Sequence, residues 1–281
     1  MTADAALYVS RMPGPFGAFV DGAGASLLEA GTLGLITDAL CEHRIIVVRD
    51  VAPTAAEYVA FGRHFGEPIA FFNERSRDRE HPELIEIHNR PSTPAALRDG
   101  AMHWHQDSSY ESPAASITML CAAEAPAAGN DTLFADVTAA YDALPATTRA
   151  RIADLVVQHD PLGGRVALDG EKRGGERKPG MTAPLVEHRL VLPHPVTGRL
   201  ALYGVSGTAA GIAGMDDDEA IALLIELKQH ALQPQFRQTA RATTGSILIW
   251  DNFAVMHSAT PTEYSDEPGH RRRLHRISIR A

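Results

Sequence analysis

The chain has 281 residues, a formal net charge of −9 and a hydrophobic content of 44%. The net negative charge argues against a nucleic-acid-binding protein, whose affinity depends on clustered positive charge. The hydrophobic content is sufficient for a full core, and no stretch approaches the ~20 apolar residues of a membrane span. The sequence also lacks the charged start and apolar run of a signal peptide, so a cytoplasmic protein is predicted.

The first third of the chain alternates between helix and strand patterns. Apolar residues recur at helical spacing over 33–40 and predict a helix, which precedes an apolar strand at 45–48. Thr54 and Glu57 form a capping box at the start of a second helix, and Gly66 is its predicted end. These elements indicate a mixed α and β fold at the amino-terminal end.

The remaining elements are mostly short strands. Acidic residues at 216–219 favour a helix start, because a helix N-terminus attracts negative charge. Short strands separated by Gly and Pro turns are typical of a double-sheet jelly roll, so a mainly β, single domain with flanking helices is predicted for 1–281. The segment 161–184 is rich in Gly and charge and is predicted to be a mobile loop, either an active-site lid or a surface excursion. The predicted strands are 84–88, 115–121, 132–135, 189–192, 200–203 and 246–250.

A histidine is followed two positions later by an acid in two places. On a strand, side chains two residues apart point the same way, so His105 and Asp107 could hold one ion between them. The composition, with 13 His and 35 Asp plus Glu, produces about as many such pairs by chance as the two observed. Pro82 makes a strand less favourable at His81 and Glu83, which leaves the other pair as the candidate.

A third ligand is available far downstream. His257 would complete a set of two histidines and one carboxylate with His105 and Asp107. This set leaves adjacent coordination positions open, as a non-haem Fe(II) centre requires to bind a cosubstrate and O2. His103 shares the predicted strand face of His105, so a pairing of His103 with His105 is an alternative.

The carboxyl-terminal segment 271–280 has the composition of a final strand. Arg272 and Arg276 would share one face of it with Leu274 and Ser278. Four residues at ~3.3 Å each separate the two arginines by roughly 13 Å, enough to bind two different anions on opposite sides of one metal. Guanidinium groups bind carboxylates through paired hydrogen bonds. Alternatively, the arginines are solvated charges that protect a sheet edge.

Six motifs, in order along nearly the whole chain, resemble those of a known family. The chain is similar to the Fe(II)/2-oxoglutarate-dependent dioxygenases of the taurine dioxygenase and 2,4-dichlorophenoxyacetate dioxygenase type (TauD/TfdA). The motifs are at 104–110, 129–134, 139–145, 194–199, 250–252 and 271–276.

This resemblance implies roles for individual residues. His105, Asp107 and His257 would bind Fe(II). Thr132 and Arg272 would bind the distal carboxylate of 2-oxoglutarate, the cosubstrate that is used with O2. The family also implies the jelly-roll fold, the double-stranded β-helix, and makes His103 a pocket residue.

The resemblance further implies a substrate site. Arg276 matches the position that holds the anionic group of taurine, so a small anionic or zwitterionic substrate is expected, with Tyr110 and Phe71 as further contacts. The polar substrate contacts of the taurine enzyme are replaced here by Phe71 and Phe72 and by small residues at 204–210. A substrate bulkier or more apolar than taurine is therefore expected.

The expected reaction is hydroxylation of an aliphatic C–H bond, with release of succinate and CO2. Desaturation or oxidative cleavage uses the same iron ligands and stays open. Two less favoured alternatives are a zinc hydrolase with the same ligands and a non-catalytic jelly-roll binding protein. The expected partner is a small molecule, with no nucleic acid or membrane, and a homo-oligomer is possible.

Overall fold

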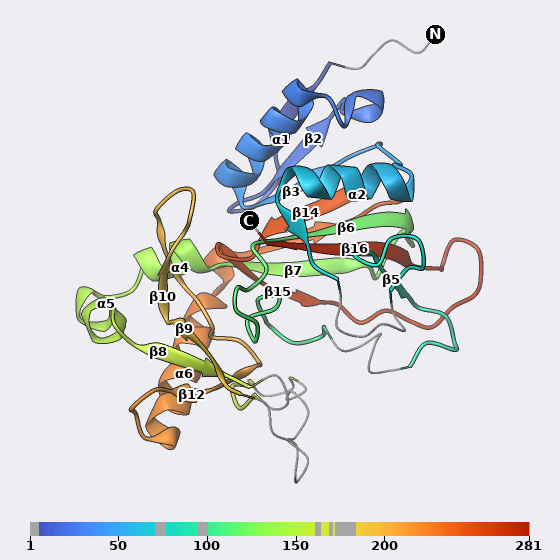
Figure 1. Cartoon of the computed structure of the whole chain (residues 1–281). Coiled ribbons are helices and arrows are strands. Elements are labelled where there is room, and N and C mark those ends of the chain that lie inside the picture. Colours follow the sequence, from blue (N-terminus) through green and yellow to red (C-terminus); the bar gives the residue numbers. More distant parts are fainter. Residues whose placement is uncertain are drawn as a thin grey trace.

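Two facing β-sheets with helices on the outside organise the protein in the computed structural model (Figure 1). The structure describes residues 6–70, 77–94, 101–160, 164–168, 171 and 184–280. The fold is mixed and mainly β, with flanking helices, as predicted. Phe71, Phe72 and most of the predicted loop at 161–184 lie outside the described residues.

The amino-terminal helices form where the sequence predicts them. Helix α1 spans Ala30–His43, and α2 spans Ala55–His64 with both hydrogen bonds of the capping box between Thr54 and Glu57. Gly66 follows α2 with a φ of 142°, which a side chain would disfavour. Both helices cover the outer face of the larger sheet (Figure 1).

The larger sheet has the strand order β1-β2-β3-β14-β6-β16-β4, with β5 also paired to β16. Its central strands are apolar on both faces because each face is buried. In β14, Ile247 and Ile249 pack toward α1 and α2, whereas Leu248 and Trp250 pack toward the smaller sheet. The strands are β1 (Tyr8–Arg11), β2 (Ala18–Asp21), β3 (Ile45–Val48), β4 (Glu67–Pro68), β5 (Ile85–His88), β6 (Ile117–Glu124), β14 (Ile247–Asp251) and β16 (Arg273–Arg280).

The smaller sheet consists of β7 (Asp131–Asp136) between β13 (Arg237–Arg241) and β15 (Val255–Ala259). Phe134 of β7 and Val255 of β15 are fully buried against the inner face of the larger sheet. The space between the two sheets is therefore the inner layer of the molecule.

A lobe packs beside the two sheets around its own apolar cluster (Figure 1). The predicted helix after 216–219 is present, with Asp216 as its N-cap. The predicted strand at 189–192 was wrong, because the chain breaks at Leu190 into two strands with different partners. The lobe contains α4 (Val137–Asp142), α5 (Ala146–Ile152), β8 (Val156–His159), β9 (Val186–Arg189), β10 (Val191–Pro193), β11 (Leu200–Leu202), β12 (Ala209–Ile212) and α6 (Asp217–Ala231).

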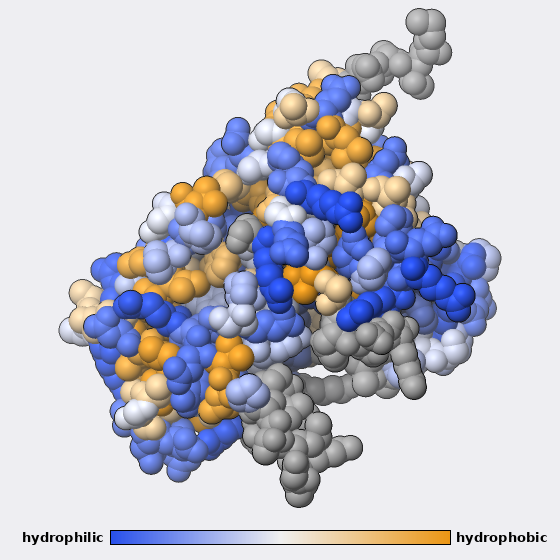
Figure 2. All heavy atoms as spheres, in the orientation of Figure 1, coloured by the Kyte–Doolittle hydropathy of each residue, from blue (hydrophilic) through white to orange (hydrophobic). Residues whose placement is uncertain are grey.

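Hydrophilic residues cover much of the face shown in Figure 2, with hydrophobic residues gathered in patches over the lobe and around the amino-terminal elements. Exposed large hydrophobic residues of the lobe include Leu185, Val196 and Leu200. In the described part of the chain, no helix combines the length and apolar character needed to cross a bilayer.

Candidate metal centre

Two histidines from distant parts of the chain are joined through their backbones. The amide of His105 donates to the carbonyl of His257, and the amide of His257 donates back, both at 2.9 Å. Their rings lie side by side, with centroids 4.2 Å apart. The prediction of a strand at His105 was wrong, because its pairing with His257 is a single isolated bridge.

Asp107 reaches the two histidines from a turn and not from a strand. The following residue, Ser108, has a φ of 53°, so the chain reverses immediately after the carboxylate. The carboxylate oxygens of Asp107 lie 3.7 Å from Nε2 of His105 and 3.6 Å from Nε2 of His257. The ligand atoms of all three residues lie within 4.8 Å of one another, so they could hold a metal ion.

Both histidines are in the protonation state that a metal requires. Burial, assisted by the neighbouring imidazole, lowers the pKa of His105 to about 3. Burial also lowers the pKa of His257 to about 4, although the charge of Asp107 opposes that shift. Nδ1 of His105 lies 2.7 Å from the carbonyl oxygen of His103, which favours the tautomer with a free Nε2 lone pair. Neutral imidazoles can therefore bind a cation without first releasing a proton.

Asp107 keeps its negative charge in this buried position. Burial alone would raise its pKa, but the charge of Arg276 lowers the pKa of Asp107 below its ordinary value, assisted at low pH by the protonated forms of His257 and His105 and by the hydrogen bond from Thr118. Nη2 of Arg276 lies 2.7 Å from Oδ1 of Asp107. The donor set thus fits a divalent cation, with two neutral imidazoles and one carboxylate at one point.

His103 lies behind this group, because its ring stacks on that of His105 with centroids 4.6 Å apart. It does not belong to the cluster of candidate metal ligands that the described residues form. A β-carbon on Gly207 would come within 2.7 Å of the His103 ring, so the glycine allows the segment at 204–210 to pack closely there.

A cavity of about 120 Å³ opens beside the three candidate ligands. Thr132, Arg272 and Arg276 line it together with His105, Asp107 and His257, while Ile87, Leu120, Trp250 and Leu274 supply apolar walls. Arg272, Leu274 and Arg276 therefore face the same side, as the alternation along the final strand predicts. His275 points elsewhere and lies 3.8 Å from Glu86.

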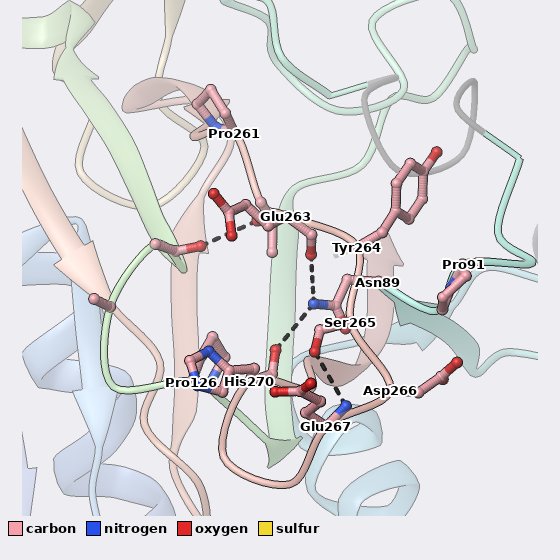
Figure 3. A pocket seen from close by; sticks show the side chains of 13 residues that line it. Asn89, Pro91, Pro126, Pro261, Glu263, Tyr264, Ser265, Asp266, Glu267 and His270 are labelled. Atoms are coloured by element: carbon pink, nitrogen blue, oxygen red, sulfur yellow. Dashed lines mark hydrogen bonds between the residues drawn. The ribbon is translucent and has the colours of Figure 1, made fainter.

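Arg272 is 7% exposed and is held by its neighbours. Its Nη1 donates to Oγ1 of Thr262 at 2.9 Å, and its backbone amide donates to Oδ1 of Asn89 at 2.7 Å. Nδ2 of Asn89 donates to the carbonyls of Glu263 at 2.7 Å and His270 at 3.1 Å (Figure 3). Asn89 therefore fixes the loop that leads into β16 and sets where Arg272 enters the cavity.

A larger and more open cavity of about 1030 Å³ lies along this loop, and Figure 3 shows its lining. Asn89 and Thr262 are among the lining residues, together with Glu263, Asp266 and Glu267. The three candidate metal ligands do not line it. The larger cavity is therefore not assigned a role in chemistry at the three candidate ligands, although it is the bigger of the two.

The predicted substrate residues have different positions. Arg276 lines the metal cavity, whereas Tyr110 does not. Burial raises the pKa of the Tyr110 hydroxyl, and the nearby charge of Arg276 opposes that shift. Phe71 lies outside the described residues.

Several other polar residues have structural partners. Nε2 of His194 contacts Oδ2 of Asp251 at 2.5 Å, and Nε2 of His230 lies 2.8 Å from the carbonyl of Ala140. Arg63 pairs with Glu83 at 2.9 Å. The His81 and Glu83 pair does not form a candidate metal cluster among the described residues.

A buried ion pair fixes the chain beside the candidate metal ligands. Nζ of Lys228, which is fully buried on α6, lies 2.6 Å from Oε2 of Glu171. Oε1 of Glu171 accepts a hydrogen bond from the amide of Trp104 at 2.9 Å, directly before His105. No sequence pattern indicated this pair, because its members are distant in the chain and typical of surface positions.

Four buried polar residues that support the site were also missed: Asn89, Thr118, Asn252 and Thr262. Asn252 follows Trp250 and Asp251 within a family motif, so that motif was its only signal. Thr118 lies in an apolar strand, where a single threonine is ordinary.

Comparison with known proteins identifies the family. Residues 9–278 match the model of the family described as "Taurine catabolism dioxygenase TauD, TfdA family". The chain is 32% identical over 228 residues to the alpha-ketoglutarate-dependent 2,4-dichlorophenoxyacetate dioxygenase of Cupriavidus pinatubonensis, covering 77% of this chain and 78% of that protein. It is 31% identical over 267 residues to the (S)-phenoxypropionate/alpha-ketoglutarate-dioxygenase of Sphingobium herbicidovorans, covering 92% and 91%.

The three-dimensional comparison agrees. A crystal structure of a taurine dioxygenase from Burkholderia xenovorans matches with a TM-score of 0.77 at 27% identity, covering 98% of this chain and 91% of that one. The chain therefore belongs to the TauD/TfdA family and is an oxidoreductase of the dioxygenase class that uses Fe(II), 2-oxoglutarate and O2.

Proposed function

We propose that this dioxygenase hydroxylates an aliphatic C–H bond of a small anionic or zwitterionic organic molecule, with His105, Asp107 and His257 as the iron ligands. Fe(II), 2-oxoglutarate and O2 together supply the oxidant and release succinate and CO2. The clustering of the three ligand atoms within 4.8 Å supports the assignment of the ligands. The two relatives named for phenoxy acids support a small organic acid as substrate.

Thr132 and Arg272 are proposed to bind the distal carboxylate of 2-oxoglutarate. Both line the cavity of about 120 Å³ that contains the three ligands. Arg272 is buried and already oriented by Thr262 and Asn89, so little side-chain entropy is lost when it binds a carboxylate. A fixed guanidinium would orient the cosubstrate toward the metal.

The single observation that carries the substrate class is the position of Arg276. Its guanidinium lies at the metal cavity, 2.7 Å from Asp107, and its side chain is 18% exposed. A guanidinium has five N–H donors, and the contact with Asp107 is a single one through Nη2. We propose that its other N–H groups bind a carboxylate or sulfonate of the substrate, with Tyr110 and Phe71 as additional contacts.

The fold and domain assignment are proposed on similar grounds. We infer one domain built on a double-stranded β-helix, because the larger and smaller sheets bury one common layer of side chains. The metal centre would lie between the sheets, because residues of both line the cavity beside it. Location in the cytoplasm and assembly into a homo-oligomer remain predictions of the sequence.

Substrate-dependent succinate release tests the proposal. A panel of carboxylates, sulfonates and matched neutral amides would be assayed with the wild-type chain, Arg276→Ala and a control, Arg273→Ala. Arg273 is the appropriate control because it lies on the same strand and contacts Glu124 at 3.3 Å outside the cavity. We expect anionic substrates to be preferred and Arg276→Ala alone to raise their KM. Preferred turnover of a neutral compound, insensitive to Arg276→Ala, would reject the substrate class.

A further inference from the structure

Asp107 is surrounded by polar residues that are buried in an otherwise apolar layer. Thr118 and Asn252 have no exposed surface, and Trp250 is 2% exposed. Burying such polar groups is costly unless each is hydrogen-bonded. The register of the sheet places Thr118 opposite Trp250 on one side and opposite Ser278 on the other. Thr118 is therefore enclosed by both neighbouring strands.

The hydrogen bonds around Asp107 have a defined direction that begins at Trp250. An indole N–H can only donate, so Nε1 of Trp250, 3.0 Å from Oδ1 of Asn252, fixes which end of that amide faces it. Nδ2 of Asn252 is then turned toward Thr118 and donates to its hydroxyl oxygen at 2.9 Å. The single hydroxyl proton of Thr118 is thereby directed to Oδ2 of Asp107, at 2.7 Å.

A second set of contacts holds the turn that carries Asp107. Nε2 of Gln106 donates to the carbonyl of Asn252 at 2.9 Å, and Oε1 of Gln106 accepts from the amide of Gly204 at 2.9 Å. The backbone amide of Asp107 also points to Oδ1 of Asn252, at 3.4 Å. Asn252 therefore contacts both the backbone that carries Asp107 and the hydroxyl that contacts its carboxylate.

We infer that Thr118, oriented by Asn252 and Trp250, is a positioning residue that fixes the carboxylate of Asp107 for metal binding. This inference rests on the proposed function, since it takes Asp107 as an iron ligand. Thr118 donates a hydrogen bond to Oδ2 while Arg276 forms an ion pair with Oδ1, so rotation of the carboxylate would break one hydrogen bond and one ion-pair contact. The remaining lone pairs stay available for a metal ion. The folded protein thus holds the ligand in place before the metal arrives.

Binding of Co(II) alone, without 2-oxoglutarate, tests this role under anaerobic conditions by calorimetry and by the visible absorption of the Co(II) protein. Thr118→Val removes the hydroxyl and keeps the side-chain shape, whereas Thr118→Ser keeps the hydroxyl. Ser278→Ala is the matched control, because that buried hydroxyl lies 3.4 Å from Thr118 without contacting Asp107. Urea unfolding of the metal-free variants measures any general loss of stability separately.

We expect Thr118→Val to weaken Co(II) binding by about 10-fold to 100-fold and to alter the Co(II) spectrum. Thr118→Ser and Ser278→Ala should stay close to wild type. Unchanged Co(II) affinity in Thr118→Val would overturn the inference, and equal weakening in Thr118→Ser would assign the effect to packing instead.

Two further variants cover the cases in which Thr118→Val does not fold or the metal ligands are misassigned. If Thr118→Val does not fold, Trp250→Phe removes the donor that orients Asn252, and unchanged Co(II) affinity there would also overturn the inference. His257→Ala separates this outcome from failure of the proposed function. If His257→Ala binds Co(II) as tightly as wild type, the metal ligands themselves are misassigned, whatever Thr118 does.

Discussion

Single residues decide whether this site can hold a metal and its cosubstrate. The three candidate ligands are buried or half-buried, and each contributes through one side-chain atom. His257 is far from His105 and Asp107 in the sequence, yet a backbone bridge makes it a neighbour of His105. Substitutions at these positions should therefore affect metal binding more than the sheets around them.

The first prediction concerns metal content. We expect Asp107→Ala and His257→Ala to lose bound iron and all 2-oxoglutarate-dependent turnover while they retain the wild-type circular dichroism spectrum. His103→Gln should retain iron, because His103 stacks behind His105 and does not belong to the cluster of candidate ligands. Elemental analysis of purified proteins measures this directly. Loss of iron in His103→Gln with retention in His257→Ala would favour the alternative pairing of His103 with His105.

The second prediction concerns Arg272. Loss of a charge-assisted contact to a carboxylate costs about 1.5 to 3 kcal/mol, so Arg272→Ala should weaken 2-oxoglutarate binding by one to two decades. The anaerobic absorption band of 2-oxoglutarate bound to Fe(II) gives the affinity by titration. Arg271→Ala serves as the control, because Arg271 contacts Glu124 at 3.2 Å and does not line the metal cavity. An unchanged titration for Arg272→Ala would move the carboxylate contact elsewhere.

The identities of the candidate ligands could be predicted from the sequence, but not the way in which they meet. The motif at 104–110 indicated His105 and Asp107, although the alternation of a strand is not what brings them together. Ser108, with a φ of 53°, turns the chain after Asp107, and no sequence pattern announces that turn. Thr118 could not be predicted either, because its role depends on the strands on both sides of it.

At the scale of elements, local patterns are reliable where neighbouring residues determine the structure. The capping box at Thr54 and the acidic N-terminus of α6 both lie within one helical turn, and both helices form as predicted. The strand predicted at 189–192 failed, because the break at Leu190 depends on partners in β8 and β11. The end of β9 and the start of β10 are thus determined by strands distant in sequence, and local propensity does not predict them.

The third prediction tests the pair that fixes the chain beside Trp104. Removing one partner of a buried ion pair costs about 3 to 5 kcal/mol, because it leaves an uncompensated charge. We therefore expect Lys228→Met to lower the free energy of unfolding by about that amount, and Lys228→Met with Glu171→Gln to recover part of it. Urea titration at neutral pH measures both.

The matched surface control for this pair is Arg165→Ala. Arg165 pairs with Asp217 at a position where both side chains are largely exposed, so its loss should cost about 1 kcal/mol or less. If Lys228→Met cost no more than Arg165→Ala, the buried pair would contribute nothing beyond an ordinary surface contact.

At the scale of the whole molecule, buried neutral histidines set a lower limit on the pH at which the fold is stable. His159 has no exposed surface, and burial lowers its pKa to about 3. Between about pH 6.5 and pH 3, the unfolded histidine binds a proton and the folded His159 does not, because the unfolded pKa is near 6.5. The stability linked to His159 is therefore complete above about pH 6.5 and is lost as the pH falls toward about 3.

The fourth prediction follows from this difference. In His159→Gln, the free energy of unfolding should fall less steeply with decreasing pH than in wild type, by up to about 1.4 kcal/mol per pH unit below pH 6.5. Urea titrations at about pH 7.5, 6 and 5 give the slopes. Identical slopes in the two proteins would mean that His159 is accessible to protons in the folded state.

The overall arrangement of the sheets could be predicted only through the family resemblance. Composition and short strands favour two packed sheets, but they do not order β14 between β3 and β6. That order depends on pairings between strands far apart in sequence, and the central strands β3 and β14 are apolar on both faces. Alternation of polar and apolar residues therefore carries little information about which strand lies beside which.

The backbone bridge between His105 and His257 also closes a long stretch of chain, from before β6 to within β15. Chain entropy opposes the closure of such a loop, and a ligand that binds only the folded state offsets that cost by mass action. At a free concentration of 100 times its dissociation constant, such a ligand adds about 2.7 kcal/mol to stability. Iron bound by both His105 and His257 would thus stabilise the contact between the segment before β6 and strand β15. Loss of iron would then lower the free energy of unfolding of a protein that stays folded, in addition to halting its turnover.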